Sequence, residues 1–302
     1  SSKGGANFYF AVISDTHNLN DRESEQEVIF AATAELLNAF VPALDFVIIT
    51  GDLVDGLPSD DPAYYEQYKC PVDDLAELSK AYKFPVHFVM GNHDYYTGGG
   101  ILQAITTDKP GREALYKNRL GMPDPYYSFV NKGVRFYCLN SMQQDPAVSW
   151  NPNLVGSFGP TQIEWLKKGL ADGLPSFLFQ HHPLATKKTV SAGFSQFYPF
   201  EVPYAPGHFS KYDGSPMQDY TDPIFGVIKA NNVQIQADFF GHTHMFMTDE
   251  YEGVPLFMTD TMKPPASTEY DGKPMRFHIV ECQADTGAFS IYNAYMIKYA
   301  DI

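Results

Sequence analysis

The sequence predicts an α/β protein in which strands and helices alternate. Short apolar, β-prone runs alternate with segments of helical spacing, and each of these runs ends in polar residues. Towards the C-terminus, β-prone runs follow one another without helices between them. We expect a single domain over residues 1–302, because the length suits one large core and no linker or internal repeat is visible.

The N-terminal part predicts two successive strand and helix units. Residues 7–14 form an apolar run typical of a strand buried on both faces, and apolar positions in residues 23–40 recur at helical spacing. Residues 46–50 form the next strand, which completes a β-α-β unit. A helix over residues 62–82, at the least from Val72, and a strand over residues 86–90 repeat the pattern.

The rest of the chain predicts further helices and a second set of strands. We expect helices over residues 113–120, 161–170 and 222–230, with Glu164 placed for a capping box at the start of the second. The other expected elements are a hairpin of residues 126–130 and 134–140, strands over residues 177–179 and 235–240, and antiparallel strands over residues 254–258, 276–282 and 288–295.

Composition excludes several classes of protein. The chain has 21 basic and 36 acidic residues and a net charge of −15, which argues against nucleic-acid polymers and anionic membranes as partners. No apolar run is long enough for a transmembrane helix. Three widely spaced cysteines without a C-x-x-C motif predict buried free thiols.

The composition also bears on localisation. Few lysines and many Tyr, Asn and Pro residues favour an exported protein, periplasmic or secreted; a cytoplasmic protein is the alternative. The oligomeric state is not predicted.

Five predicted strands end in side chains that bind metals. Because ligands bind beyond the carboxyl ends of strands in open α/β sheets, these side chains can converge on one edge. The set combines carboxylates, imidazoles and one amide, which suits Zn, Mn or Fe(II), and one bridging carboxylate would complete a two-metal site for phosphoryl displacement. Its members are Asp15, His17, Asp52, Asn92, His181, His242 and His244.

The order of these motifs resembles the calcineurin-like metallophosphoesterases. The motifs D-x-H, G-D-x-x-D, G-N-H-D, H-x-P and G-H-x-H occur in that order between residues 9 and 244. The resemblance implies a four-layer αββα sandwich of two mixed sheets flanked by helices, with a dinuclear metal site at the C-terminal ends of the strands. The D-x-H start and His181-His182-Pro183 are most similar to bacterial phosphodiesterases of the cyclic-nucleotide and glycerophosphodiester type. Gly56 stands where the protein phosphatases of the family carry an arginine.

The resemblance also implies a role for each matched residue. Asp15, His17 and His244 would bind one metal ion, Asn92, His181 and His242 would bind the other, and Asp52 would bridge them. A metal-bridging hydroxide would be the nucleophile, His93 the general acid and Asp55 its hydrogen-bond partner. Asp55 could instead cap the following turn. The ions would be two of Mn, Zn or Fe.

The function expected from this resemblance is hydrolysis of a small or medium phosphodiester, and the partner is therefore a small phosphate ester. A phosphomonoesterase is the alternative, and a non-catalytic scaffold on the same fold is a third reading. Residues 184–223 form an aromatic-rich insert that we expect at the rim of the substrate site. Its rings could stack on a substrate or pack on one another: Phe194, Phe197, Tyr198, Tyr204, Phe209 and Tyr212.

Five other positions have titratable side chains without an assigned role in the metal site. His182 is either a substrate contact or a filler, and His208 in the insert is a candidate substrate contact. Asp94 is expected to support the turn rather than to act in catalysis. His87 and His278 lie within predicted strands and are expected to be structural.

Overall fold

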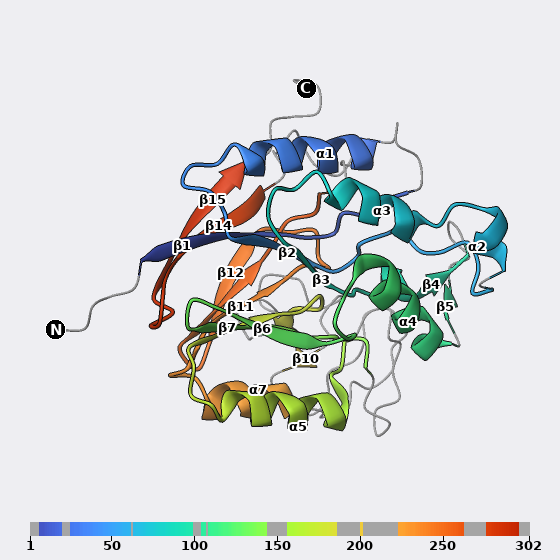
Figure 1. Cartoon of the computed structure of the whole chain (residues 1–302). Coiled ribbons are helices and arrows are strands. Elements are labelled where there is room, and N and C mark those ends of the chain that lie inside the picture. Colours follow the sequence, from blue (N-terminus) through green and yellow to red (C-terminus); the bar gives the residue numbers. More distant parts are fainter. Residues whose placement is uncertain are drawn as a thin grey trace.

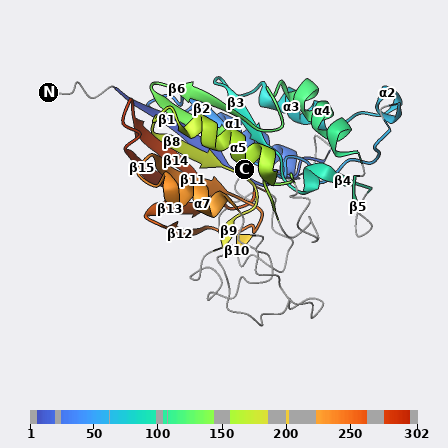
Figure 2. The same cartoon turned by 90° about the horizontal axis from the view of Figure 1, so that it is seen from below.

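The computed structural model describes residues 6–19, 25–61, 63–98, 104–106, 108–143, 156–185, 200–201, 223–262 and 276–295. These residues form four layers (Figure 1). Helices α1 (Glu25–Asn38) and α3 (Pro71–Ser79) cover one β-sheet, and helices α5 (Gly159–Leu170) and α7 (Pro223–Ala230) cover the other. Figure 2 shows α5 and α7 lying over the outer face of this second sheet. The predicted fold class, two mixed sheets flanked by helices, is confirmed.

The first sheet has the strand order β15-β14-β1-β2-β3. Its strands β1, β2 and β3 are parallel, whereas β14 is antiparallel to both of its neighbours. The β1-α1-β2 unit forms as the sequence predicts, and β2 is buried along its whole length. The bounds are β1 (Asn7–Ile13), β2 (Phe46–Thr50), β3 (Val86–Val89), β14 (Arg276–Gln283) and β15 (Phe289–Tyr295).

The second sheet has the strand order β12-β13-β11-β8-β7-β6. Strands β7, β8, β11 and β13 are parallel, and the antiparallel strands β6 and β12 form the two edges. The bounds are β6 (Tyr127–Asn131), β7 (Val134–Cys138), β8 (Ser176–Phe179), β11 (Ile235–Phe240), β12 (Met247–Tyr251) and β13 (Val254–Met258).

Smaller elements connect these layers. Helix α4 (Lys109–Leu120) packs near α3, and the 3-10 helix η1 (His93–Tyr95) follows β3. Two pairs of short strands complete the described part: β4 (Tyr96–Thr97) with β5 (Ala104–Ile105), and β9 (Leu184–Ala185) with β10 (Phe200–Glu201).

The structure corrects three local predictions. The helix expected over residues 62–82 is two helices, α2 (Tyr64–Gln67) and α3, because the backbone before Pro71 is extended, as proline favours. The capping box of α5 is wrong: the helix begins after Phe158 without a side-chain cap, and Glu164 pairs with Lys167 instead. Of the three antiparallel strands expected towards the C-terminus, β14 and β15 pair in this way, but β13 lies in the other sheet, parallel to β11 and antiparallel to β12. Strand β12 was not predicted.

The layer between the sheets is rich in aromatic rings. Phe10 of β1 lies with its ring centroid 5.3 Å from Phe136 of β7 and 5.7 Å from Phe177 of β8, both edge-on. Such contacts add to the stabilisation from buried area. They fix the spacing of the two sheets, and hence of the loops that leave them.

The three cysteines are free and buried, as predicted.

The strands that precede the predicted site residues all end at the site. Strands β1, β2 and β3 are parallel neighbours in one sheet, and β8 and β11 are parallel neighbours in the other. Their carboxyl ends therefore lie at one edge of each sheet.

None of the helices in the described part of the chain combines the length and the apolar character that a membrane span requires.

Candidate metal centre

Backbone hydrogen bonds hold the five motif loops together beyond the ends of their strands. The N–H groups of Asp15 and His17 donate to the carbonyls of Gly51 and Asp52, at 3.1 and 2.9 Å. On the other sheet, the N–H group of Gly241 donates to the carbonyl of His181 at 3.0 Å. The loops after neighbouring strands are thus paired, so the side chains that they carry have fixed relative positions.

Five of the predicted metal ligands have left-handed backbone conformations. The φ angles are 52° for Asp15, 45° for His17, 47° for Asp52, 70° for His242 and 54° for His244. This region is unfavourable for residues with a Cβ atom, and non-glycine residues in it cluster at functional sites. The three other described non-glycine residues with positive φ are Lys132, Glu252 and Asp285, which lie in turns between strands. The strain is therefore concentrated at the predicted site.

Two motif glycines are required by close packing. A Cβ atom on Gly241 would lie 1.8 Å from Ser14 Oγ and 2.2 Å from Asp15 Oδ2. A Cβ atom on Gly51, whose φ is +96°, would lie 2.4 Å from Nδ1 of His181. Any side chain at these positions would displace a predicted ligand, which explains why glycine precedes Asp52 and His242.

The first group of possible metal donors combines Asp15, His17, Asp52 and His244, whose ligand atoms lie within 4.8 Å of one another. Nε2 of His244 lies 3.3 Å from Asp15 Oδ1 and 3.2 Å from Nε2 of His17. Nε2 of His17 lies 3.6 Å from Asp52 Oδ2. Two carboxylates and two imidazoles thus face a common point.

The second group combines Asp52, His181 and His242. Nε2 of His181 lies 3.1 Å from Asp52 Oδ1 and 3.0 Å from Asn92 Oδ1, and Nδ1 of His242 lies 3.0 Å from the same amide oxygen. The Asn92 amide group donates to the hydroxyl of Tyr96 at 2.9 Å, which turns its oxygen towards the histidines. Asp52 belongs to both groups, so two positions for a cation share one carboxylate.

The hydrogen bonds of His181 leave its Nε2 lone pair available to a metal ion. Nδ1 of His181 lies 2.8 Å from the carbonyl oxygen of Thr50 and must donate to it, which leaves Nε2 with a lone pair. That lone pair faces two further acceptors, the oxygens of Asp52 and Asn92. Without a cation, this cluster favours a proton: although burial opposes it, Asp52 raises the pKa of His181 to about 9. A divalent ion would replace this proton.

Asp55 contacts two histidines, not one. Its Oδ1 lies 2.9 Å from Nδ1 of His17 and 3.0 Å from Nδ1 of His93. The rings of the two histidines are nearly perpendicular, with centroids 4.6 Å apart. A carboxylate on Nδ1 turns Nε2 of each ring towards Asp52, at 3.6 Å for His17 and 4.0 Å for His93.

Burial lowers the pKa of some histidines in the site, whereas nearby carboxylates raise the pKa of His93. Burial lowers the pKa of His17 and lowers that of His242 to about 3, so both rings are neutral, as metal ligands must be. Burial alone would also lower the pKa of His93, but the carboxylates of Asp52 and Asp55 outweigh it and raise that pKa. His93 therefore keeps a proton more readily than an isolated histidine does.

Supporting residues around the groups were only partly predicted. Asp94 is fully buried and accepts hydrogen bonds from the N–H groups of Leu53, Val54 and Gly91, so it joins two motif loops, as expected of a turn-supporting residue. Burial raises its pKa to about 7. The contact of Tyr96 with Asn92 was missed, because nothing in the local sequence indicates it.

Asp260 was also missed, although a signal for it existed. It follows strand β13, in the same position relative to a strand as the predicted ligands, and it is 4% exposed. Burial raises its pKa to about 6. The neighbouring Thr261 hydroxyl donates to the carbonyl of Asp15 at 2.9 Å, which places this loop beside the first group.

The remaining histidines fall outside the two groups. His182 is buried, with Nδ1 2.8 Å from Ser141 Oγ and its ring centroid 4.4 Å from that of His242. His87 stacks on Phe129 at 3.8 Å, and His278 is buried against the ring of Phe246. Both have the structural surroundings expected of them. His208 and the six aromatic residues named for the insert lie outside the described residues.

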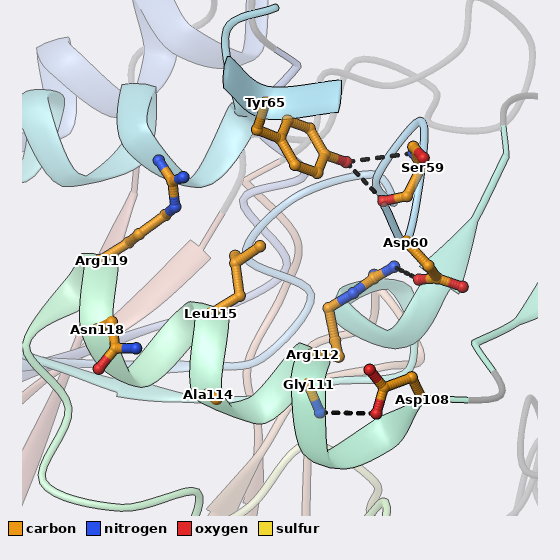
Figure 3. A pocket seen from close by; sticks show the side chains of 10 residues that line it. All are labelled: Ser59, Asp60, Tyr65, Asp108, Gly111, Arg112, Ala114, Leu115, Asn118 and Arg119. Atoms are coloured by element: carbon orange, nitrogen blue, oxygen red, sulfur yellow. Dashed lines mark hydrogen bonds and ion pairs between the residues drawn. The ribbon is translucent and has the colours of Figure 1, made fainter. Parts of the chain in front are cut away.

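A cavity of about 490 Å³ lies between α4 and the loop before α2, and none of the predicted site residues lines it (Figure 3). Arg112 in its wall points to Asp60 and donates to its carboxylate at 2.5 Å. The same guanidinium donates to the backbone carbonyls of Asp94 and Tyr96, both at 2.9 Å. The wall of the cavity therefore supports the loop that carries His93.

The fold and these side chains define an α/β protein with two adjoining Asp/His groups that could each hold a metal ion. The family model for calcineurin-like phosphoesterases matches residues 8–246. The chain belongs to this family, whose members are metal-dependent phosphoric ester hydrolases.

Solved structures of similar fold are only distantly related in sequence. A putative 5'-nucleotidase from Staphylococcus aureus is 12% identical with a TM-score of 0.52, and the match covers 98% of this chain and 56% of that one. GAP50 of Plasmodium, an anchor in the inner membrane complex, is 12% identical with a TM-score of 0.50 and coverages of 97% and 90%. The phosphopantetheinyl hydrolase of Mycobacterium tuberculosis is 15% identical with a TM-score of 0.48 and coverages of 85% and 91%. No curated protein sequence matches the chain.

Proposed function

We propose that the protein hydrolyses a small phosphodiester with two transition-metal ions drawn from Mn, Zn and Fe. The observation that carries this proposal is Asp52, which is shared by two groups of metal-binding side chains and has His93 beside it. Two cations joined by one carboxylate are the arrangement used for in-line displacement at phosphorus. The residue roles that follow are part of the proposal.

Each side chain has a defined place in this scheme. We assign Asp15, His17 and His244 to one ion, Asn92, His181 and His242 to the other, and Asp52 to both. The ions, when bound, would lower the pKa of a water molecule and offset the negative charge of the phosphoryl group. Before an ion binds, positive charge on His181 and His93 outweighs burial and holds the pKa of Asp52 well below its ordinary value. A bound ion would take the place of the charge on His181.

His93 supplies the proton for the leaving group. Asp55 contacts its Nδ1 and so leaves Nε2 directed towards the groups that would hold the ions. The two carboxylates that raise its pKa favour the protonated ring, and donation from Nε2 to the ester oxygen would stabilise the departing alkoxide.

Charge favours a diester over a monoester. A phosphodiester carries one negative charge near neutral pH, whereas a monoester carries almost two. The two groups contain two carboxylates, Asp15 and Asp52, and the whole chain carries −15. A monoanionic substrate therefore meets less repulsion than a dianionic one.

The test is turnover after chelation and reconstitution. Protein stripped of metal and reloaded with Mn or Zn should hydrolyse bis-p-nitrophenyl phosphate faster than p-nitrophenyl phosphate, and the stripped protein should lose activity by at least about a thousandfold. If protein carrying two metal ions turns over neither ester, the hydrolase assignment fails. Turnover of the monoester alone would replace the diesterase by a phosphomonoesterase.

Asp55→Asn should weaken both metal binding and catalysis, because Asp55 contacts His17 as well as His93. We expect metal affinity to fall about 10- to 100-fold, the usual effect of removing a partner that orients a metal-binding histidine. Metal titration followed by elemental analysis measures this loss. If Asp55 only caps a turn, the variant will lose thermal stability while its metal affinity stays unchanged.

A further inference from the structure

Arg276 lies at the edge of the first sheet where the metal centre forms. In the register of β14 against β1, His278 pairs with Val12. Two residues from this pair, β14 begins at Arg276 while β1 leaves the sheet at Ser14, immediately before Asp15. The backbone therefore places Arg276 alongside the first predicted ligand.

The side chain of Arg276 is held by a ring from the last motif loop. Its Cζ atom lies 4.6 Å from the ring centroid of Phe246, two residues after His244. Phe246 stacks on His278 at 4.8 Å, so this ring has little freedom to move. An aromatic face of this kind orients a guanidinium plane without using its N–H donors.

Arg276 differs from the other arginines that the structure describes. Arg112, Arg119 and Arg135 each hydrogen-bond a carboxylate directly. Arg276 approaches Asp260 only to 3.7 Å through Nε, and within the described part of the chain this buried Nε has no hydrogen-bond partner. A buried donor without a partner is unfavourable, so this arrangement is better suited to a ligand than to the stability of the fold.

The loop that carries Asp260, the neighbour of Arg276, is bonded to the loop of the first predicted ligand. Asp260 precedes Thr261, whose hydroxyl bonds the carbonyl of Asp15 at 2.9 Å. The Arg276 side chain is 29% exposed, so it is partly open to solvent beside the group that contains the Asp15 and Asp52 carboxylates. The guanidinium has no lone pair to offer a metal ion, so its N–H groups can contact a substituent of the substrate instead.

We propose that Arg276 binds a second oxyanion of the substrate, such as a carboxylate or phosphate on one arm of the phosphodiester. This inference rests on the proposed function and narrows its substrate class. In a chain with a net charge of −15, a guanidinium oriented by an aromatic ring would offset repulsion of such a group and bind it through two parallel hydrogen bonds.

The test compares two p-nitrophenyl phosphodiesters with the same leaving group. The second arm of one ends in a carboxylate, and that of the other ends in the uncharged methyl ester of the same acid. With metal-loaded protein, Arg276→Gln should lower kcat/KM for the carboxylate about 10- to 100-fold, mainly through KM, and by less than about threefold for the methyl ester. Arg276→Lys should recover part of the loss, because it keeps the charge but not the fork of donors.

Arg135→Gln is the matched control. Arg135 has a similar exposure of 23% and a carboxylate partner in Asp172, but it lies at the start of β7, away from the motif loops. Its substitution should affect both esters alike. Equal losses for the two esters in Arg276→Gln, or no loss, would overturn the proposed oxyanion contact.

A binding measurement separates this inference from the proposed function. If the wild type hydrolyses neither ester, the hydrolase proposal fails, and calorimetric titration with the carboxylate ester decides the role of Arg276. Binding that Arg276→Gln weakens about tenfold, without a change for the methyl ester, supports the oxyanion contact. Equal binding by wild type and variant rejects it.

Discussion

Replacing His93 with alanine should abolish most hydrolysis of alkyl phosphodiesters while leaving two metal ions bound. We expect kcat to fall about 10²- to 10⁴-fold for an alkyl leaving group and about tenfold or less for p-nitrophenolate, because a general acid matters least when the leaving anion is already stable. His93 is suited to this role because the carboxylates of Asp52 and Asp55 raise its pKa. Steady-state kinetics on a pair of esters with different leaving groups measures the difference.

The matched control for this variant is His87→Gln. His87 lies on β3, the strand that leads to His93, but its ring stacks on Phe129 outside the Asp/His groups. Activity should stay within about twofold of the wild type. The general-acid role would be refuted if His93→Ala reduced turnover of both esters equally, and the assignment would also need revision if the variant lost metal.

Asp52→Asn should reduce metal content and activity together. Asp52 is 2% exposed and faces Nε2 of His17 through one oxygen and Nε2 of His181 through the other. Asparagine removes the negative charge that would attract both ions, so we expect fewer than two ions per chain and an activity at least about a thousandfold lower. Several kcal/mol of lost transition-state stabilisation correspond to such a factor. Elemental analysis of purified protein gives the metal content.

Asp238→Asn provides the control for a lost buried carboxylate. Asp238 lies on β11 before the motif with His242, is fully buried, and has no hydrogen-bond partner for either carboxylate oxygen among the described residues. Burial raises its pKa well above the ordinary value, which favours the uncharged acid, and asparagine is likewise uncharged. This variant should keep two ions, and an unchanged metal content in Asp52→Asn would contradict the bridging role.

The fold was predictable to the extent that its signals are local. Apolar runs such as residues 46–50 read as buried strands because a strand covered on both faces needs apolar side chains at every position, and β2 has these bounds. The strand Met247–Tyr251 was missed, since its residues alternate between partly buried and exposed, as an edge strand allows. The break before α3 was missed because helical spacing continues across residues whose backbone is extended.

The candidate site also has features that the local sequence predicts and contacts that it does not. Polar motifs at strand ends predicted the candidate donor side chains, because a run of apolar residues that stops at a carboxylate or histidine is visible in the sequence alone. The assignment of those residues to two metal ions stays a prediction, and its geometry is consistent with the two groups around Asp52. The contacts of Tyr96 with Asn92 and of Asp55 with His17 join residues whose pairing leaves no local pattern.

The sequence by itself determined the class of fold, the donor types and their order along the chain, since these depend on apolar runs and on the residues that end them. Tertiary structure alone decided which donors face a common point and which nitrogen each imidazole presents. Nδ1 of His181 is occupied by a carbonyl from β2, and Nδ1 of His17 by a carboxylate from the next loop. These contacts arise where strands from two packed sheets end together, and the left-handed backbone at five of the donors exists only because the neighbouring loops hold it there.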